Sequence, residues 1–413
     1  MNLQAVGTDF AAHWALYLSM PLIAAAIGYA TKVVAIRMMF EPLEFRGLRS
    51  PYFGWQGIVP RNARRMAGVA CDLMLSRLVD PEEVIGRLDP KRVAREIEAP
   101  LLASMEEITH EVASSYQPGL WERLPAPLKA RVIQRVQAEA PKLVADIMRD
   151  LQNNIHEVLD LKHMVVENLT REPALLNRIF QESGEAEFRF IRHAGLYFGF
   201  LLGCVQAFTW AFTHSEWIMP VFGGLTGWFT DWLALKMIFY PKRPMDFGPV
   251  RWQGLFLKHR AEVSARYGAL IADEVITPGA LIDAILQGPL SDRLFGMVHQ
   301  RVVEMVDEQA GPMKPLVVLA LGDARWQAMK NDVARKTIER LPETLRHMEQ
   351  YAGDAMDLRN LLVTKMQQLT EEEFVGLLRP AFQQDEWALI AVGAVLGFLV
   401  GELQVFLMLH LAH

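Results

Sequence analysis

Four long apolar stretches constrain the fold of this chain more than any other feature of its sequence. They comprise residues 14–31, 194–213, 217–230 and 387–401, none of which contains Asp, Glu, Lys or Arg. The last two stretches are each followed by one acidic residue, Asp231 or Glu402, and then by further apolar residues. A helix needs about 20 mainly apolar residues to cross the hydrocarbon core of a membrane. We therefore expect four transmembrane helices.

The remainder of the chain is too polar to lie in lipid. Charged residues make up 22% of the 413 residues, and the formal net charge is −6. This mildly acidic balance excludes the basic footprint of a nucleic-acid-binding protein. The two cysteines, Cys71 and Cys204, are too few for a disulfide framework, and we expect Cys71 to be a buried thiol.

The distribution of Lys and Arg predicts how the membrane helices are oriented. The segments without either residue are 1–31, 193–235 and 380–413. Basic residues gather at the opposite helix ends, for example at Arg37 and Lys236. Because basic residues favour the cytoplasmic side of a membrane, we expect the segments at about 41–193 and 242–386 to be cytoplasmic. Both chain termini and the turn at 214–218 would then face outward.

The chain also matches itself at an offset of about 199 residues. The segment GYATKVVAIRMMFEP at 28–42 aligns with GWFTDWLALKMIFYP at 227–241. Downstream, WQG and GFLLGCVQAF are matched in the same order by a second WQG and by GFLVGELQVF. Because the order and the spacing are kept, we predict two parallel repeats related by an axis along the membrane normal. Each repeat consists of a span, a cytoplasmic helical domain and a return span.

The predicted fold class is all-α. We expect an integral membrane protein with four transmembrane helices in a parallel pseudo-two-fold internal repeat and two related cytoplasmic helical domains. The expected segments are a first helix with its tail at 1–42, helical domains at 43–193 and 242–386, a transmembrane hairpin at 194–241 and a last helix at 387–413. Within 132–159, apolar residues recur mostly every three or four positions, which indicates one helix face. Pro141 and Pro342 predict a kink in each long helix, and no β-rich segment is expected.

Two motifs carry a resemblance to a known family. Each reads GxxTxxxA[IL][KR]MxFxP and is followed by WQG and a basic residue. This pattern resembles an uncharacterised family of bacterial membrane proteins, the domain-of-unknown-function 445 group with its YheB-type members, along essentially the whole chain. The resemblance implies an inner-membrane location and no established activity. The family motif has Asn at the place where this chain has Lys32 in one copy and Asp231 in the other.

Lys32 and Asp231 are the first candidates for a functional site. They occupy the same repeat position with opposite charge, so near the symmetry axis we expect one buried ion pair. Other polar residues of the apolar stretches are Thr31, Thr230, Gln206, Gln404 and Glu402. Glu402 faces either the bundle interior or the outer surface.

Two interpretations of these intramembrane polar residues stay open. An ionisable residue in a membrane helix is by default a candidate for an ion or proton relay. The structural alternatives are a pair that fixes the register of the bundle or a Lys32 side chain that reaches the interface.

Glycines and interfacial residues have mainly structural interpretations. The glycines at expected packing positions are Gly28, Gly227, Gly199, Gly203, Gly397 and Gly401. Small residues with this spacing let helices approach closely in lipid. The candidate interfacial or headgroup residues are Trp55, Trp252, Arg61, Lys258, Arg37 and Lys236. Aromatic and basic side chains of this kind anchor a protein at lipid headgroups.

No catalytic, cofactor or metal site is expected. The sequence contains no P-loop, GxSxG, HExxH or Rossmann motif. His156, Asp160 and His163 have a spacing that would suit metal ligands, but a solvated polar helix face is the favoured interpretation.

The amphipathic faces of the two cytoplasmic domains leave two functions open. If these faces bury against each other, the protein is a scaffold for partner proteins on the cytoplasmic side. If they leave a groove, it holds an acyl chain or another amphiphile from the membrane lipids. We expect a non-enzymatic protein of one of these kinds, with no nucleic-acid partner and with its oligomeric state undetermined. The alternative is a small ion- or proton-coupled transporter that uses Lys32, Asp231 and Glu402.

Overall fold

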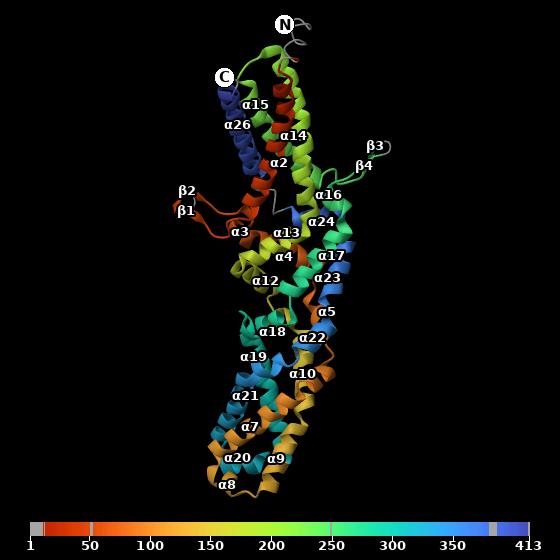
Figure 1. The fold of residues 1–413 in the computed structure, drawn as a ribbon. Coiled ribbons are helices and arrows are strands. Elements are labelled where there is room, and N and C mark those ends of the chain that lie inside the picture. The colour runs from red at the N-terminus through yellow and green to blue at the C-terminus, as the bar shows by residue number, and fades with distance from the viewer. Residues whose placement is uncertain (1–10, 12, 50–52, 248–249, 380–385, 412–413) are drawn as a thin grey trace. The chain divides into compact units, whose positions relative to one another are not determined.

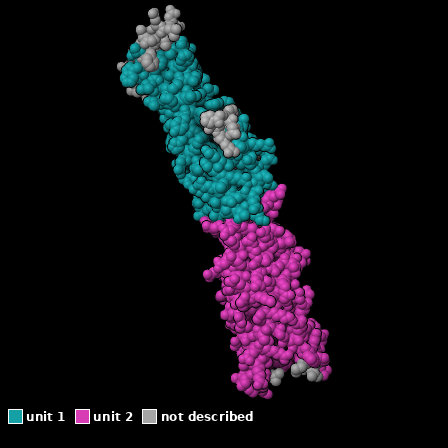
Figure 2. All heavy atoms as spheres, turned by 90° about the vertical axis from the view of Figure 1, so that its right-hand side faces the viewer, with its two compact units in different colours: residues 1–73, 169–270, 363–413 teal, residues 74–168, 271–362 magenta. Residues whose placement is uncertain are grey.

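The chain forms two compact units (Figure 2). The computed structural model describes residues 11, 13–49, 53–247, 250–379 and 386–411. Unit 1 comprises residues 1–73, 169–270 and 363–413, and unit 2 comprises residues 74–168 and 271–362. Each unit takes helices from both halves of the chain, so the units do not follow the boundaries expected at 43–193 and 242–386. Amphipathicity indicates which face of a helix is buried but not which helix covers it, and the sequence therefore did not reveal this exchange.

Four long helices form the apolar part of unit 1. They are α2 (Trp14–Phe40), α14 (Glu185–Thr213), α15 (Ile218–Phe239) and α26 (Glu386–Leu411). Helix α2 packs along α14, and α15 packs along α26 (Figure 1). Among the residues that the structure describes, α2, α14 and α26 are long and apolar enough to cross a membrane. Helix α15 carries Asp231 and Lys236 and is not among these candidates.

Glycines set the distance between the paired helices. A Cβ atom added at Gly28 would lie 2.1 Å from the carbonyl oxygen of Gly195, and one at Gly227 would lie 2.0 Å from that of Gly393. Similar contacts join Gly199 to Ala24, Gly203 to Pro21, Gly397 to Gly223 and Gly401 to Pro220. Any larger side chain at these places would push the backbones apart. All six glycines singled out in the sequence lie at these contacts.

Two short β-hairpins follow α2 and α15 and correct the expectation that no β-rich segment occurs. Their strands are β1 (Arg46–Arg49), β2 (Phe53–Trp55), β3 (Met245–Phe247) and β4 (Val250–Trp252). Both strand pairs are antiparallel; Arg46 pairs with Trp55 in the first, and Met245 pairs with Trp252 in the second. Strands of three or four residues are too short to show the alternation by which strands are recognised in a sequence.

Shorter helices complete unit 1. They are α3 (Ile58–Arg61), α13 (Pro173–Ser183), α16 (Leu255–Lys258), α17 (Arg260–Leu270) and α24 (Glu371–Leu378). The boundary between the units falls within α4 (Ala63–Arg77), α12 (Leu161–Arg171) and α23 (Leu358–Gln368). The buried Asn177 of α13 donates its Nδ2 to the carbonyl oxygen of Phe40 at 2.6 Å, which ties α13 to the end of α2. Cys71 of α4 is buried, as expected.

Unit 2 is helical throughout its described residues. From the first half of the chain it contains α5 (Pro81–Gly86), α6 (Pro90–Glu96), α7 (Glu98–Tyr116), α8 (Pro118–Arg123), α9 (Ala126–Ala138), α10 (Ala140–Asn153) and α11 (Ile155–Val158). The second half supplies α18 (Pro278–Gln287), α19 (Ser291–Ala310), α20 (Lys314–Leu321), α21 (Asp323–Arg346) and α22 (Glu349–Met356), with single turns at Ile271–Val275 and Gly311–Met313. Helix α7 packs on α21 and α10 on α19, so the two halves share one core.

The two prolines that predict kinks lie in different surroundings. Helix α9 ends at Ala138 and α10 begins at Ala140, which puts Pro141 in the first turn of a new helix. A proline is tolerated there because the amide hydrogens of a first turn have no partner within the helix. Pro141 therefore marks a helix boundary, whereas Pro342 lies inside the continuous helix α21.

Candidate functional site

The structure brings Lys32 of α2 and Asp231 of α15 into one buried ion pair. The Lys32 Nζ atom donates to Oδ1 of Asp231 and also, at 2.8 Å, to Oγ1 of Thr230. Lys32 is 1% exposed and Asp231 is 4% exposed. The Thr230 hydroxyl donates to the carbonyl oxygen of Thr226 at 2.7 Å. Two opposite charges and a fixed hydroxyl thus link the two helix pairs of unit 1.

Two further glycines make room for this ion pair. A Cβ atom at Gly195 of α14 would lie 2.8 Å from Cγ of Lys32, and one at Gly393 of α26 would lie 1.7 Å from Oδ2 of Asp231. The sequence interpretation missed both glycines. A signal was present, because Gly195 and Gly393 each lie one four-residue step before Gly199 and Gly397. Each charged side chain therefore packs on the glycine seam of its own helix pair.

The pair is enclosed rather than open to solvent. The second carboxylate oxygen of Asp231 is buried and has no hydrogen-bond partner among the described residues. Removing two charges from water costs several kcal/mol per ion, and only close pairing with good hydrogen bonds offsets that cost. Loss of either partner would leave the other as an uncompensated buried charge.

The other intramembrane polar residues do not join the pair. Thr31 donates its hydroxyl to the carbonyl oxygen of Ile27 at 2.9 Å. Gln206 is buried and donates Nε2 to the sulfur of Met219 at 2.8 Å. Gln404 is also buried, and its Nε2 has no partner among the described residues. Glu402 is exposed on α26, so it does not face the interior of the bundle.

The basic candidates for the interface are exposed at the ends of their helices. Arg37 pairs with Glu41 at 2.7 Å, and the Lys236 ammonium lies 5.2 Å from the ring centre of Tyr240. Arg61 and Lys258 end the four-residue helices α3 and α16. Trp55 is half-buried, and its Nε1 has no partner among the described residues. The side chain of Trp252 lies outside the described residues.

The histidines with metal-ligand spacing lie apart. His156 Nε2 is 3.1 Å from Glu82, whereas His163 Nε2 is 3.3 Å from Glu167. The Asp160 carboxylate accepts the backbone N–H of His163, which marks a helix start. His156 lies with Glu82 and Asp80 in an exposed group whose ligand atoms are within 4.8 Å of one another. Exposed acidic groups of this kind are common on helix surfaces and do not define a metal site.

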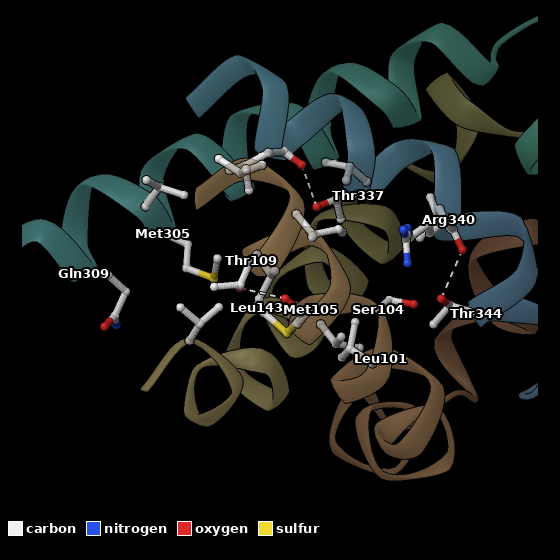
Figure 3. Close-up of a pocket in the computed structure, with 18 of the residues that line it drawn as sticks. Leu101, Ser104, Met105, Thr109, Leu143, Met305, Gln309, Thr337, Arg340 and Thr344 are labelled. Carbon is white, nitrogen blue, oxygen red and sulfur yellow. Dashed lines mark hydrogen bonds between the residues drawn. The ribbon is translucent and has the colours of Figure 1, made fainter. Parts of the chain in front are cut away.

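A second candidate site is a cavity of about 290 Å³ within unit 2. Helices α7, α9, α10, α19 and α21 supply its walls, and Met105, Met305 and Thr337 point into it from three of them (Figure 3). The apolar lining includes Leu101, Ile108, Val112, Val132, Val136, Leu143, Ile147, Val298, Met329 and Val333. Residues 132 and 136 lie on α9 and residues 143 and 147 on α10, so the single helix face expected over 132–159 is divided between two helices. No pattern in the sequence indicates a space beside them.

The threonines of this cavity add little polarity to its wall. Thr109, Thr337 and Thr344 each donate their hydroxyl to the carbonyl oxygen four residues earlier, at 2.7 to 3.1 Å. Because these hydroxyls are already satisfied, they need no partner from a bound molecule. The cavity therefore suits an apolar chain better than a polar ligand.

A charged cluster lies beside the cavity. Arg340 of α21, which lines the cavity, pairs with Glu107 and with Glu111 of α7. Lys336 donates to Glu111 at 2.6 Å. This hydrogen bond from Lys336, with the charges of Lys336 and Arg340, holds the pKa of Glu111 below its usual value. The cluster joins α7 and α21, two of the five helices that line the apolar space.

Comparison with known proteins places the chain among bacterial membrane proteins. The curated relatives are named UPF0754 membrane proteins: the chain is 22% identical to one from Synechococcus sp. over 96% of its own length and 99% of that protein. It is 29% identical to one from Nostoc punctiforme and 30% identical to one from Bacillus thuringiensis, over 38% and 21% of its length. These two matches span only 41% and 24% of the relatives, and a third, from Nostoc sp., spans 18%.

Neither family models nor solved structures add to this comparison, because no family model matches the chain and no solved structure matches it. The relatives and the three candidate membrane helices agree with an all-α membrane protein. The resemblance to an uncharacterised family of bacterial membrane proteins is confirmed, since the curated proteins to which the chain is similar are named UPF0754 membrane proteins.

Proposed function

We propose that this protein is a non-enzymatic membrane protein that binds the acyl chain of a lipid or similar amphiphile in unit 2. The apolar cavity between α7, α9, α10, α19 and α21 is the observation that carries the proposal. Its wall is formed mainly by aliphatic side chains and methionines, with the three threonines and with Ser104, Gln309 and Arg340 as its polar members. An acyl chain is the membrane component with matching chemistry.

The chemistry of the cavity lining supports an apolar ligand. The cavity is partly open to solvent, and its lining is mainly apolar. An apolar chain that displaces water from such a lining is stabilised by ~25 cal/mol for each Å² of apolar surface removed from water.

The size of the cavity limits the length of chain that it takes. If a methylene group fills about the ~30 Å³ that a water molecule takes in the liquid, the cavity holds roughly ten methylene groups. Burying them contributes ~0.8 kcal/mol each, or ~8 kcal/mol before the loss of ligand motion is subtracted. We therefore expect micromolar or weaker binding and a preference for medium-length acyl chains.

The membrane arrangement belongs to the same proposal. We infer that α15 is a fourth span and that the bilayer is the bacterial inner membrane, with unit 2 cytoplasmic and both termini outside. The proposed parallel repeat is supported by element order, since α2 and α15 are each followed by a hairpin and a four-residue helix. Each of them also packs on a glycine-lined return helix.

We propose a structural role for the Lys32–Asp231 pair rather than the alternative of transport. Gly195 and Gly393 hold both side chains in close contact with helix backbone, and Glu402 is exposed away from them. The pair is thus suited to fixing the register between α2 and α15. A scaffold that organises envelope partners is compatible with this role and becomes the function to pursue if no ligand is found.

The test is mass spectrometry of the lipids that remain with the purified full-length protein. Ala113→Phe fills the cavity from α7, whereas Ala103→Phe adds the same bulk on the exposed side of that helix. We expect the wild type and Ala103→Phe to retain an enriched amphiphile at near-stoichiometric level and Ala113→Phe to lose it. Equal lipid content in all three proteins and in an unrelated membrane protein would refute the proposal.

A further inference from the structure

The WQG motif has a clear structural role in both halves of the chain. In the first, Gly57 donates its N–H to the carbonyl oxygen of Pro42 at 2.9 Å, and Gln56 donates Nε2 to that of Leu43 at 2.8 Å. In the second, Gly254 bonds to the Pro241 carbonyl at 3.0 Å, and Gln253 bonds to that of Lys242 at 3.4 Å. The motif therefore clamps the base of each hairpin to the chain leaving α2 or α15.

The first clamp also fixes the hairpin close to the helix end. A Cβ atom at Gly57 would lie 2.7 Å from the carbonyl carbon of Phe40, the last residue of α2. Strand β1 begins at Arg46, so the hairpin starts within six residues of a helix that can cross a membrane. Figure 1 shows both hairpins projecting from unit 1 beside the ends of these helices.

The hairpins expose apolar side chains. Leu48 is 97% exposed, Phe53 is 68% exposed and Met245 of the second hairpin is 49% exposed. The pairing of β1 with β2 shifts register between Gly47 and Arg49, so Leu48 lies at an irregularity of the kind that redirects a side chain. An isolated two-stranded hairpin is marginally stable in water, so a surface that covers these side chains would stabilise the hairpins beyond what the clamps provide.

The charges around these side chains match an anionic surface. The segments 43–55 and 242–252 together contain five basic residues and two acidic residues, Glu44 and Asp246, and Lys242 lies 3.5 Å from Glu372. Arg46 is exposed on β1. Basic residues beside a membrane helix are attracted to anionic headgroups, and aromatic and aliphatic side chains enter the interfacial layer.

We propose that the two hairpins are membrane-surface anchors that insert Leu48, Phe53 and Met245 into the headgroup region of an anionic bilayer. The WQG clamps hold them at the level where α2 and α15 leave the lipid. The occupant of this surface is the bilayer itself, and the proposal does not depend on a ligand in unit 2.

The test uses a single fluorescent label on the full-length protein in lipid nanodiscs. Cys204→Ala removes the exposed cysteine, and Cys71 is buried. Leu48→Cys is labelled with an environment-sensitive dye, and Leu319→Cys, 83% exposed on α20 of unit 2, serves as the matched control. Acyl-brominated lipids then report contact with the bilayer.

We expect the label at 48 to be quenched at least threefold more than the label at 319, with a blue-shifted emission. Adding Gln56→Ala should halve this quenching, because the base of the hairpin is released. Quenching should also be stronger in bilayers with anionic lipid than in purely zwitterionic ones. Equal quenching of the two labels in both bilayers would overturn the proposal.

Discussion

Replacing Lys32 by leucine should destabilise the helix bundle of unit 1 far more than replacing Lys32 and Asp231 together. The Asp231 carboxylate has the Lys32 ammonium on one oxygen and no partner among the described residues on the other. Lys32→Leu therefore leaves a whole buried carboxylate without a hydrogen bond. Breaking a buried pair from one side typically costs ~3–5 kcal/mol, which corresponds to a factor of roughly 10² to 10⁴ in the unfolding equilibrium.

The double variant distinguishes a structural pair from a transport site. Replacing both residues by leucine removes both desolvation penalties, so the loss should be smaller than in either single variant. Unfolding of the four proteins by sodium dodecyl sulfate in mixed micelles, followed by circular dichroism, measures each free energy. The reasoning fails if Lys32→Leu lies within ~1 kcal/mol of the wild type, or if the losses of the two single variants simply add. Ion flux that is present in the wild type and abolished in a folded double variant would instead favour transport.

Three further predictions follow from single sites. Gly393→Ala places a methyl group against the Asp231 carboxylate and should destabilise unit 1 by ~1–3 kcal/mol in the same micelle assay, whereas Gly376→Ala, which meets nothing within 4 Å, should not. Burial raises the pKa of Asp307, but hydrogen bonds from Lys330, Lys314 and Trp326 outweigh it and hold the pKa below 3.8. The ionised carboxylate stabilises the fold fully above that value, and this stabilisation is lost as the pH falls through the lowered pKa. The difference in melting temperature between the wild type and Asp307→Asn should therefore become smaller from pH 7 to pH 3. A cysteine at the exposed position of Asn153 should be shielded from a membrane-impermeant thiol reagent in intact cells, and labelling there would reverse the proposed orientation.

The membrane helices and the ion pair could be predicted because they depend on local patterns. Four uncharged stretches form long helices, three of which are long and apolar enough to cross a membrane, and a common offset in the sequence aligns Lys32 with Asp231. The glycine spacing likewise predicts close helix contacts. The same four-residue spacing, continued toward the N-terminus from Gly199 and Gly397, also reaches Gly195 and Gly393. These features can be predicted because they depend only on residue type and on the spacing of residues along the sequence.

The cavity and the hairpins could not be predicted in this way. Val132 and Leu143 were recognised as apolar face residues, but the space beside them depends on how α7, α19 and α21 pack, which no local pattern records. The hairpins contain strands of three or four residues, so the sequence indicates Trp55 as an interfacial residue but not as part of a strand. Its WQG motif acts through hydrogen bonds to Pro42 and Leu43, which are a dozen or more residues away.

The opposite charges of the two proposed repeats also bear on how the helix bundle selects its partners. The α2·α14 and α15·α26 seams are both lined by glycine, and apolar packing in lipid hardly distinguishes one such seam from another. Two copies of the first repeat would bring Lys32 against Lys32, and two copies of the second would bring Asp231 against Asp231. Each such arrangement buries like charges without compensation, whereas the arrangement within one chain buries a neutral pair. The charge difference between otherwise similar repeats therefore favours pairing of the two halves of one chain over association of like repeats from two chains.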